Sequence, residues 1–279
     1  MRWVIRVFLL LAIAAAVLVG YGWWVARSEP LVRETRVAVR DWPVGARPVR
    51  MLLMSDIHVA GPDMPPARLE AIVAQANGLR PDVILIAGDF ISEKRVSTRT
   101  YSFDEIAAPL GRLRSPLGTF AVLGNHDHWV NADAARAALT RAGVRVLNNE
   151  AARAGPLAIG GLDDDFTGHA DLGRTLVAMQ SAGGVPVLLS HSPDPFPGLP
   201  VDVPLMVAGH THCGQISLPG IGPLATASRH GKRYACGRIE ENGRTLIVSA
   251  GLGTSIVPLR IGAVPDMWLI EIGPVDVAR

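Results

Sequence analysis

Residues 49–58 read Val-Arg-Met-Leu-Leu-Met-Ser-Asp-Ile-His, a short apolar run that ends in polar residues. A run of this length, bounded by turn-forming residues, is typical of a buried strand. The pattern occurs twice more: Val83–Ala87 precedes Gly88-Asp89, and residues 119–123 precede Gly124-Asn125-His126-Asp127. The first half of the chain is therefore predicted to hold three buried strands, each followed by polar side chains.

Helical patterns alternate with these strands, at residues 67–79, 104–113 and 133–142. Such alternation is typical of βαβ units and a largely parallel sheet. The second half is richer in strands and has one more predicted helix, Leu172–Ala182. Its predicted strands are Leu157–Gly161, 185–190, Leu205–Ala208, 234–240, 246–249 and 267–272. We expect one α/β domain with two sheets between layers of helices.

The composition narrows the class of protein. The 279 residues include 27 Lys and Arg against 25 Asp and Glu, a net charge of +2, which argues against a nucleic-acid-binding protein with a strongly basic face. A hydrophobic fraction of 49% excludes intrinsic disorder. Residues 1–27 hold three arginines and no acidic residue, so the rest of the chain has a net charge of −1. Any binding of phosphate must then come from a local site.

An uncharged segment of 20 residues, 7–26, lies near the start of the chain. At about 1.5 Å per residue, a helix of this length spans the roughly 30 Å hydrocarbon core of a bilayer. A cleaved signal peptide and a buried core helix are the alternatives, but the bulky Trp23 and Trp24 make a poor cleavage site. We expect residues 1–27 to form an uncleaved single-pass anchor in the cell (inner) membrane. Residues 28–47 would be a linker with a candidate edge strand at 32–39, and residues 48–279 the globular domain.

The charges around this segment do not decide its orientation. Arg2 and Arg6 precede it, and four arginines lie within residues 27–40. Positive charges mark the cytoplasmic side of a membrane segment, so the two flanks conflict. An extracytoplasmic domain is favoured because the N-terminal tail is short, and a cytoplasmic domain stays open.

Five short segments at the ends of predicted strands carry the polar residues that matter for chemistry. Open α/β folds build ligand sites outside the carboxyl ends of their strands. Five of the eight histidines fall in these segments, and an extended backbone would point His210 and His212 to the same side. Histidine together with carboxylate suits Zn²⁺, Mn²⁺ or Fe, so a metal site is predicted. The segments are Asp56-Ile57-His58, Gly88-Asp89, Gly124-Asn125-His126-Asp127, Ser190-His191 and Gly209-His210-Thr211-His212.

The order of these five motifs resembles that of the calcineurin-like metallophosphoesterases, over roughly residues 50–250. The longer stretches 190–194 and 209–215 resemble the branch of membrane-anchored or exported bacterial phosphoesterases. That branch usually has Pro-Glu near the last strand, where this chain has Pro265-Asp266. The departure affects no residue that the resemblance assigns to a metal.

The resemblance implies a four-layer α/β/β/α sandwich of two mixed sheets, and a centre of two divalent metal ions (Mn, Zn, Fe or Mg) bridged by Asp89. A hydroxide bridging the metals would attack phosphorus. His126 would protonate the leaving group, and Asp127 would orient His126. The implied ligands are Asp56, His58, Asp89 and His212 for the first metal, and Asp89, Asn125, His191 and His210 for the second.

Several other polar residues have weaker assignments. His128 and Arg260 are candidate substrate contacts, as are Arg229 and Lys232. The run Asp163-Asp164-Asp165 is a solvated turn or a wall of the substrate cleft. Two cysteines exclude a disulfide-rich scaffold, but Cys213 and Cys236 could pair or stay free. His169 and His230 receive no role.

These residues indicate a membrane-anchored phosphoesterase that hydrolyses a phosphodiester or pyrophosphate bond, with an amphiphilic phosphate ester as the attractive substrate. One alternative is an enzyme similar to the UDP-2,3-diacylglucosamine pyrophosphatases of lipid A assembly, which requires a domain facing the cytoplasm. The other is a catalytically silent metal-binding scaffold, disfavoured because every implied ligand position holds a competent residue. No nucleic-acid partner is expected.

Overall fold

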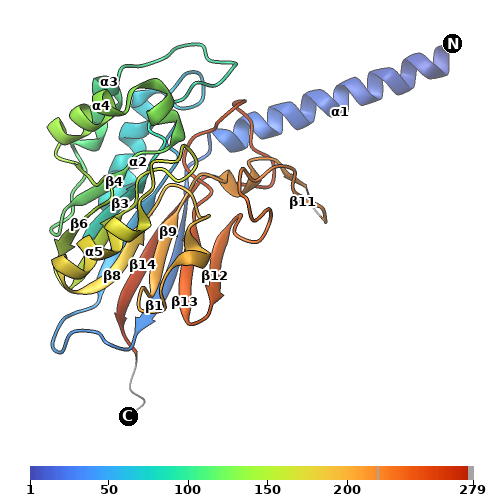
Figure 1. Cartoon of the computed structure of the whole chain (residues 1–279). Coiled ribbons are helices and arrows are strands. Elements are labelled where there is room, and N and C mark those ends of the chain that lie inside the picture. Colours follow the sequence, from blue (N-terminus) through green and yellow to red (C-terminus); the bar gives the residue numbers. More distant parts are fainter. Residues whose placement is uncertain (219, 276–279) are drawn as a thin grey trace.

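Two six-stranded sheets form the body of the computed structural model, which describes residues 1–218 and 220–275 (Figure 1). In spatial order, the first sheet consists of β1 (Leu31–Val39), β14 (Asp266–Pro274), β2 (Val49–Met54), β3 (Val83–Ala87), β4 (Thr119–Val122) and β5 (Arg145–Val146). The second consists of β12 (Gly237–Glu241), β13 (Arg244–Val248), β9 (Leu205–Ala208), β8 (Val185–Leu189), β7 (Leu157–Gly161) and β6 (Glu150–Ala154). Both sheets are mixed, because β14 runs antiparallel to β2, and β12 and β6 run antiparallel to β13 and β7.

Helices cover the outer face of each sheet. The first sheet packs against α2 (Pro66–Gly78), α3 (Phe103–Leu110) and α4 (Asn125–Arg141), and the second against α5 (Leu172–Ala182). Short 3₁₀ turns at Phe196–Gly198 and His212–Gly214 and a small hairpin of β10 (Ser217–Leu218) and β11 (Gly222–Pro223) complete the body. The predicted four-layer α/β/β/α sandwich of two mixed sheets is confirmed.

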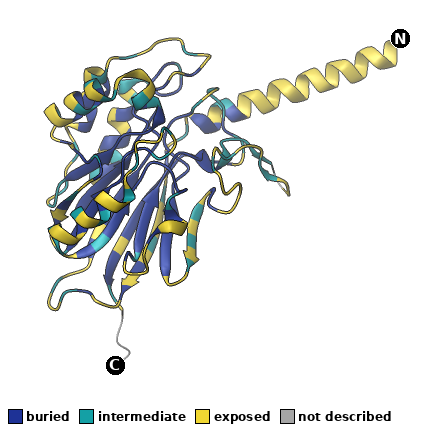
Figure 2. Cartoon of the chain, viewed as in Figure 1, coloured by how far each residue is buried: buried dark blue, intermediate teal, exposed yellow. Residues whose placement is uncertain are grey.

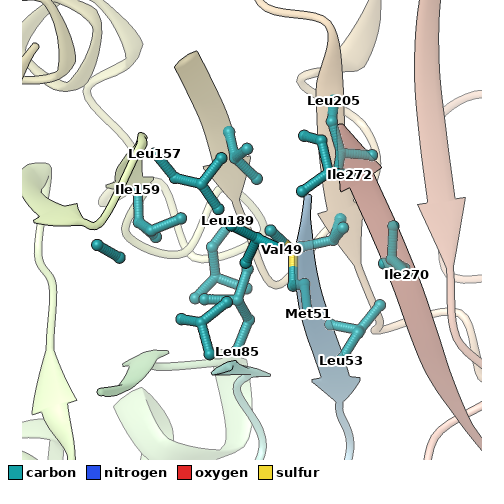
Figure 3. Close-up of a cluster of buried hydrophobic side chains, with 14 of the residues drawn as sticks. Val49, Met51, Leu53, Leu85, Leu157, Ile159, Leu189, Leu205, Ile270 and Ile272 are labelled. Carbon is teal, nitrogen blue, oxygen red and sulfur yellow. The ribbon is translucent and has the colours of Figure 1, made fainter. Parts of the chain in front are cut away.

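The alternation of side chains along β2 builds two cores at once. Met51 and Leu53 face the second sheet, in a cluster that also contains Leu85, Ile159 and Leu189 (Figure 3). Leu52 and Met54 face the other way and pack under the helices of the first sheet. Successive strand residues point to opposite faces, so a strand buried on both sides has to be apolar throughout, as this one is apart from Arg50.

The N-terminal segment forms helix α1, Arg2–Ala26, which projects from the body and is exposed along most of its length (Figure 2). By length and composition it could cross a membrane. Three residues near its end, Gly22, Val25 and Ala26, are buried against the body. The following strand, β1, pairs in parallel with β14 at the edge of the first sheet.

One predicted helix follows an additional turn, and one predicted strand begins later than expected. The helix expected at 133–142 is the part of α4 after Asn131, whose side chain accepts a hydrogen bond from the Ala134 amide at 3.0 Å. The additional turn begins at Asn125, where the Asp127 carboxylate accepts a hydrogen bond from the Gly124 amide. A kink at Asn131, where φ is −175°, separates this turn from the rest of α4. The strand expected at 234–240 begins at Gly237, because the chain turns through the buried Tyr234 and a disulfide-bonded Cys236 first.

Leu85 offers a test of the core between the sheets, because its side chain is fully buried there. We expect Leu85→Ala to lower the free energy of unfolding by about 2–5 kcal/mol, since it removes buried methyl groups and leaves a cavity. Urea denaturation followed by circular dichroism measures the change. The control is Val177→Ala, at a position 64% exposed on α5, and an equal loss in both variants would contradict this packing.

Candidate metal centre

The candidate site lies where both sheets end. Asp56, Asp89 and Asn125 follow β2, β3 and β4, which run parallel in the first sheet. His191 and His210 follow β8 and β9, which run parallel in the second. The carboxyl ends of these five strands therefore bring residues that are up to 154 positions apart, such as Asp56 and His210, into hydrogen-bonding distance.

The backbone at the site is unusual. Positive φ angles occur at five of the polar residues that turn into the site, although non-glycine residues rarely adopt them. Such strained positions gather at functional sites, where the surrounding structure holds them. The residues are Asp56 (48°), His58 (48°), Asp89 (55°), His210 (69°) and His212 (51°).

One group of ligand atoms gathers around Asp56. The Nε2 atoms of His58 and His212 lie 3.0 Å apart, and the His212 Nε2 atom lies 3.5 Å from Asp56 Oδ1. Atoms that bind one ion at about 2.0–2.2 Å are themselves roughly 3.0–3.4 Å apart. These three side chains are buried and their ligand atoms all lie within 4.8 Å of one another, so they could hold a metal ion.

A second group lies beside the first. His191 Nε2 is 3.1 Å from Asn125 Oδ1 and 3.1 Å from His210 Nδ1. Asp89 lies between the two groups, because its Oδ2 atom is 3.3 Å from both His58 Nε2 and His191 Nε2. One carboxylate oxygen thus lies within reach of both groups, as a ligand shared by two ions must be.

Backbone carbonyls orient three of the imidazole rings. His58 Nδ1 lies 3.2 Å from the Ile91 carbonyl oxygen, His191 Nδ1 lies 2.6 Å from that of Ala87, and His210 Nε2 lies 3.0 Å from that of Ala227. Each carbonyl can accept the proton of one ring nitrogen, which leaves the other nitrogen's lone pair directed into the cluster. This is the arrangement that metal-binding histidines use.

Burial sets the charge of most of these groups. It lowers the pKa of His58 and His212 well below the usual value and that of His210 to about 4, so these rings are neutral at pH 7. Burial also opposes protonation of His191, but the adjacent Asp89 carboxylate outweighs it and raises the pKa of His191. The three neutral imidazoles and the buried Asp89 carboxylate suit a divalent cation.

The predicted role of Asp127 in orienting His126 was wrong, because its carboxylate is used elsewhere. It accepts hydrogen bonds from the backbone amides of Asp89, Phe90 and Gly124, each at 2.9 Å, and from Ile91 at 3.3 Å. Asp127 therefore ties the turn after β3 to the start of α4. It positions Asp89 rather than the ring of its sequence neighbour.

His126 lies at the edge of the metal cluster, with 13% of its side chain exposed. Its ring packs edge-on against His58 and Trp129, with centroids 4.8 and 4.9 Å away. Its Nε2 atom lies 3.5 Å from the Ser255 hydroxyl. The ring is near the candidate metal ligands but has, among the described residues, none of the backbone-carbonyl contacts that orient their rings, so it remains available to a bound molecule.

Arg260 was predicted to contact substrate, and the structure contradicts this. The side chain is fully buried and donates hydrogen bonds to the carbonyls of Ala250, Gly251 and Gly253. Its Nη2 atom also lies 3.3 Å from His212 Nδ1. Arg260 supports the loop beside the candidate metal centre and is closed off from solvent.

The other weak assignments have definite partners. His128 Nε2 lies 2.8 Å from Asp163, which is buried, so this aspartate is not part of a solvated turn. Burial opposes protonation of His128, but the Asp163 hydrogen bond outweighs it and raises its pKa. Arg229 pairs with Asp165, and Lys232 donates to the Ile221 carbonyl.

Sequence reasoning missed two aromatic residues and a histidine beside the site. Trp129 packs on His126, and Phe166 lies 4.8 Å from His210 between ring centroids. Trp129 could have been found, since it lies three residues after His126 on one helix face. Neither Phe166 nor His169, which stacks on His128 at 4.2 Å, had a local signal.

Cys213 and Cys236 form a disulfide, which answers the question that their sequence positions left open. The bond joins the residue after His212 to the segment before β12, and its two cysteines are 23 positions apart in the chain. It therefore restrains the turn that carries His212.

The chain belongs to the calcineurin-like phosphoesterase family, whose family model matches residues 49–214. It is therefore a metallophosphoesterase and a metal-dependent hydrolase of phosphoric esters. This agrees with the resemblance carried by the motifs and with the grouping of their residues at one end of the two sheets.

Named relatives extend along most of the chain. It is 30% identical to the uncharacterized metallophosphoesterase YkuE of Bacillus subtilis, covering 93% of this chain and 92% of YkuE. It is 29% identical to the phosphodiesterase YaeI of Escherichia coli, covering 87% of each.

Two further matches cover less of the matched protein. A zebrafish transmembrane protein with a metallophosphoesterase domain is 29% identical over 92% of this chain, which spans 61% of that protein's length. Among solved structures, a 5'-nucleotidase precursor from Thermus thermophilus matches with a TM-score of 0.45 and 13% identity, over 81% of this chain and 55% of that one.

Asp89→Asn tests the shared carboxylate. We expect turnover to fall by about a hundredfold or more. Mutation of groups that only support metal ligands already lowers metal affinity or activity about 10–100-fold. Metal content, measured on the purified protein by mass spectrometry, should fall in the same variant. Asp202→Asn, at an exposed position, is the matched control, and full turnover and metal content in Asp89→Asn would contradict the bridging position.

Proposed function

We propose that this chain is a membrane-anchored phosphoesterase that hydrolyses a phosphodiester or pyrophosphate bond with two divalent metal ions. The observation that carries the proposal is Asp89 Oδ2, 3.3 Å from a histidine nitrogen in each of the two groups. Two-metal hydrolases place their ions about 3.5–4 Å apart, and a single carboxylate between the ion sites suits that spacing.

Seven side chains would hold the ions, divided as the two groups around Asp89 suggest. When bound, the metals would activate water and neutralise charge on the phosphoryl oxygens. Asn125 would contribute a neutral oxygen rather than a charged one. The positive charge of the ion that it binds would then be less neutralised, and the ion would attract an anionic ester more strongly. The first ion would be held by Asp56, His58, Asp89 and His212, and the second by Asp89, Asn125, His191 and His210.

His126 would give a proton to the leaving oxygen. It lies beside the ligand His58 and faces the Ser255 hydroxyl, so one ring nitrogen can reach a bound ester. Its own backbone amide donates a hydrogen bond to Asp89 Oδ1 at 2.9 Å, which fixes the position of the His126 backbone relative to the shared carboxylate. Its orientation comes from this amide and from packing against Trp129, rather than from Asp127.

Removing the His126 ring separates chemistry from metal binding. We expect His126→Ala to keep both metals but to slow turnover of bis-p-nitrophenyl phosphate with Mn²⁺ about 10²–10⁴-fold, the usual contribution of a general acid. His230→Ala, at an exposed histidine, is the control. If the wild-type protein binds two ions and turns over no phosphate ester with any divalent metal, the enzymatic proposal is wrong.

The membrane part of the proposal rests on α1, an exposed apolar helix of 25 residues. Tyr21, Trp23 and Trp24 lie at the end nearer the body, where aromatic rings favour the membrane–water interface. The words "transmembrane protein" in the zebrafish relative's name agree with an anchor.

The disulfide favours an extracytoplasmic domain, because such bonds persist in oxidising compartments and are rare in the reducing cytoplasm. This weighs against an enzyme similar to the UDP-2,3-diacylglucosamine pyrophosphatases, whose nucleotide substrate is cytoplasmic. Phosphodiesters of the envelope, including amphiphilic ones, are the favoured substrates.

Reporter fusions after Arg279 test this orientation. We expect an alkaline phosphatase fusion to be active, since that reporter needs an oxidising compartment. A green fluorescent protein fusion should be dark, because the reporter would be exported in an unfolded state. Thiol labelling of the denatured protein should find no free cysteine until a reductant is added. The reverse pattern would place the domain in the cytoplasm and favour the nucleotide-lipid pyrophosphatase.

A further inference from the structure

The end of α1 is packed into the domain rather than loosely tethered to it. The Arg260 amide donates to the Gly22 carbonyl at 2.9 Å. The Arg68 guanidinium donates to the Ala26 and Ser28 carbonyls at 2.8 and 2.9 Å, which satisfies groups at the helix terminus. These bonds fix the direction in which the helix leaves the domain.

Exposed apolar side chains lie on the chain segments next to this junction. Ile221 and Leu224, at the β10–β11 hairpin, are 61% and 60% exposed, and Ile256 is 62% exposed. The hairpin is joined to the junction because the Ser217 amide donates to the Ile261 carbonyl at 2.7 Å, one residue after Arg260. In Figure 1, the β11 region extends from the body on the side from which α1 emerges.

The charges beside this patch suit a lipid surface. The Lys232 ammonium donates to the Ile221 carbonyl at 2.6 Å, which holds a cation against the apolar hairpin. The Arg27 guanidinium lies 5.1 Å from the centre of the Trp23 ring at the end of α1. Cations next to exposed apolar and aromatic side chains are typical of surfaces that enter the headgroup region of a bilayer.

We propose that Ile221, Leu224 and Ile256 form a second membrane contact, which enters the lipid–water boundary next to α1. The occupant is the bilayer, because the segments that carry these side chains are hydrogen-bonded to the segment that holds the end of the apolar helix. Tyr21 and Trp24, 49% and 66% exposed, lie among the last six residues of α1, beside its buried residues, at the level where the boundary is expected. A helix and a hairpin together hold the domain at a fixed height and tilt.

This contact brings the mouth of the candidate metal centre to the lipid surface. Ile256 follows Ser255, whose hydroxyl lies 3.5 Å from His126 Nε2. The half-exposed rings of Trp129 and Phe166 pack against His126 and His210 of the same centre. Resting on the proposed function, this geometry assigns to the enzyme amphiphilic phosphate esters whose apolar chains stay in the bilayer while the phosphate reaches the metals.

Photocrosslinking tests the contact directly. The full chain would carry the photoreactive residue p-benzoylphenylalanine in place of Ile221 or Leu224, in vesicles of phosphatidylcholine and phosphatidylglycerol. We expect lipid adducts at both positions by mass spectrometry. Val177 and Val201, which are 64% and 76% exposed on other segments of the body, should give none. Absence of lipid adducts at 221 and 224, or adducts to protein instead, would overturn the membrane contact.

A kinetic comparison tests the substrate class. Ile221→Asp combined with Leu224→Asp should raise the KM for vesicle-embedded p-nitrophenyl hexadecyl phosphate about tenfold or more, since two apolar side chains no longer enter lipid. Turnover of water-soluble bis-p-nitrophenyl phosphate should not change in this variant. The control variant, Val177→Asp combined with Val201→Asp, should keep the wild-type values for both substrates. An unchanged KM in the double variant would refute the substrate class. If the wild-type protein binds metals but hydrolyses neither ester, the proposed function itself is refuted.

Discussion

A single buried carboxylate, that of Asp89, is the constraint around which the rest of the structure is arranged. It is 2% exposed and lies against histidines from both sheets, His58 and His191. A buried carboxylate is costly unless it is paired and hydrogen-bonded. Here the His126 amide donates to its other oxygen, and Asp127 binds its backbone amide. The two sheets must meet at this point for the cluster to form.

Close packing around the cluster explains two glycines. A Cβ atom at Gly124 would lie 2.3 Å from an Asp89 oxygen and 2.8 Å from the His191 ring, and one at Gly209 would lie 2.3 Å from Asp56. These are approaches that no side chain can make, so each motif needs its glycine for space. The motifs thus encode both the ligand atoms and the room that the neighbouring ligands require.

Much of the fold was predictable from local patterns. The strands β3 and β9 are continuous apolar runs, and β2 is one apart from Arg50, as expected for strands buried on both faces. The predictions failed where a partner far away in the chain determines the role of a side chain. Asp127 follows His126 in the chain, but its carboxylate accepts hydrogen bonds from the amides after β3. Arg260 has the charge of a phosphate ligand, yet three carbonyls of one loop surround it.

The sequence by itself determined the membership in the family, the strand–helix alternation and the set of residues that could bind metal, because these depend on residue type and short spacing. Only the tertiary structure decided which residues meet. The pairing of Cys213 with Cys236, the aromatic rings of Trp129 and Phe166 at the site, and the packing of α1 against the Arg260 segment all depend on contacts between segments far apart in the chain. Such contacts are set by how the two sheets stack and where their loops converge, and no local spacing of residues records that.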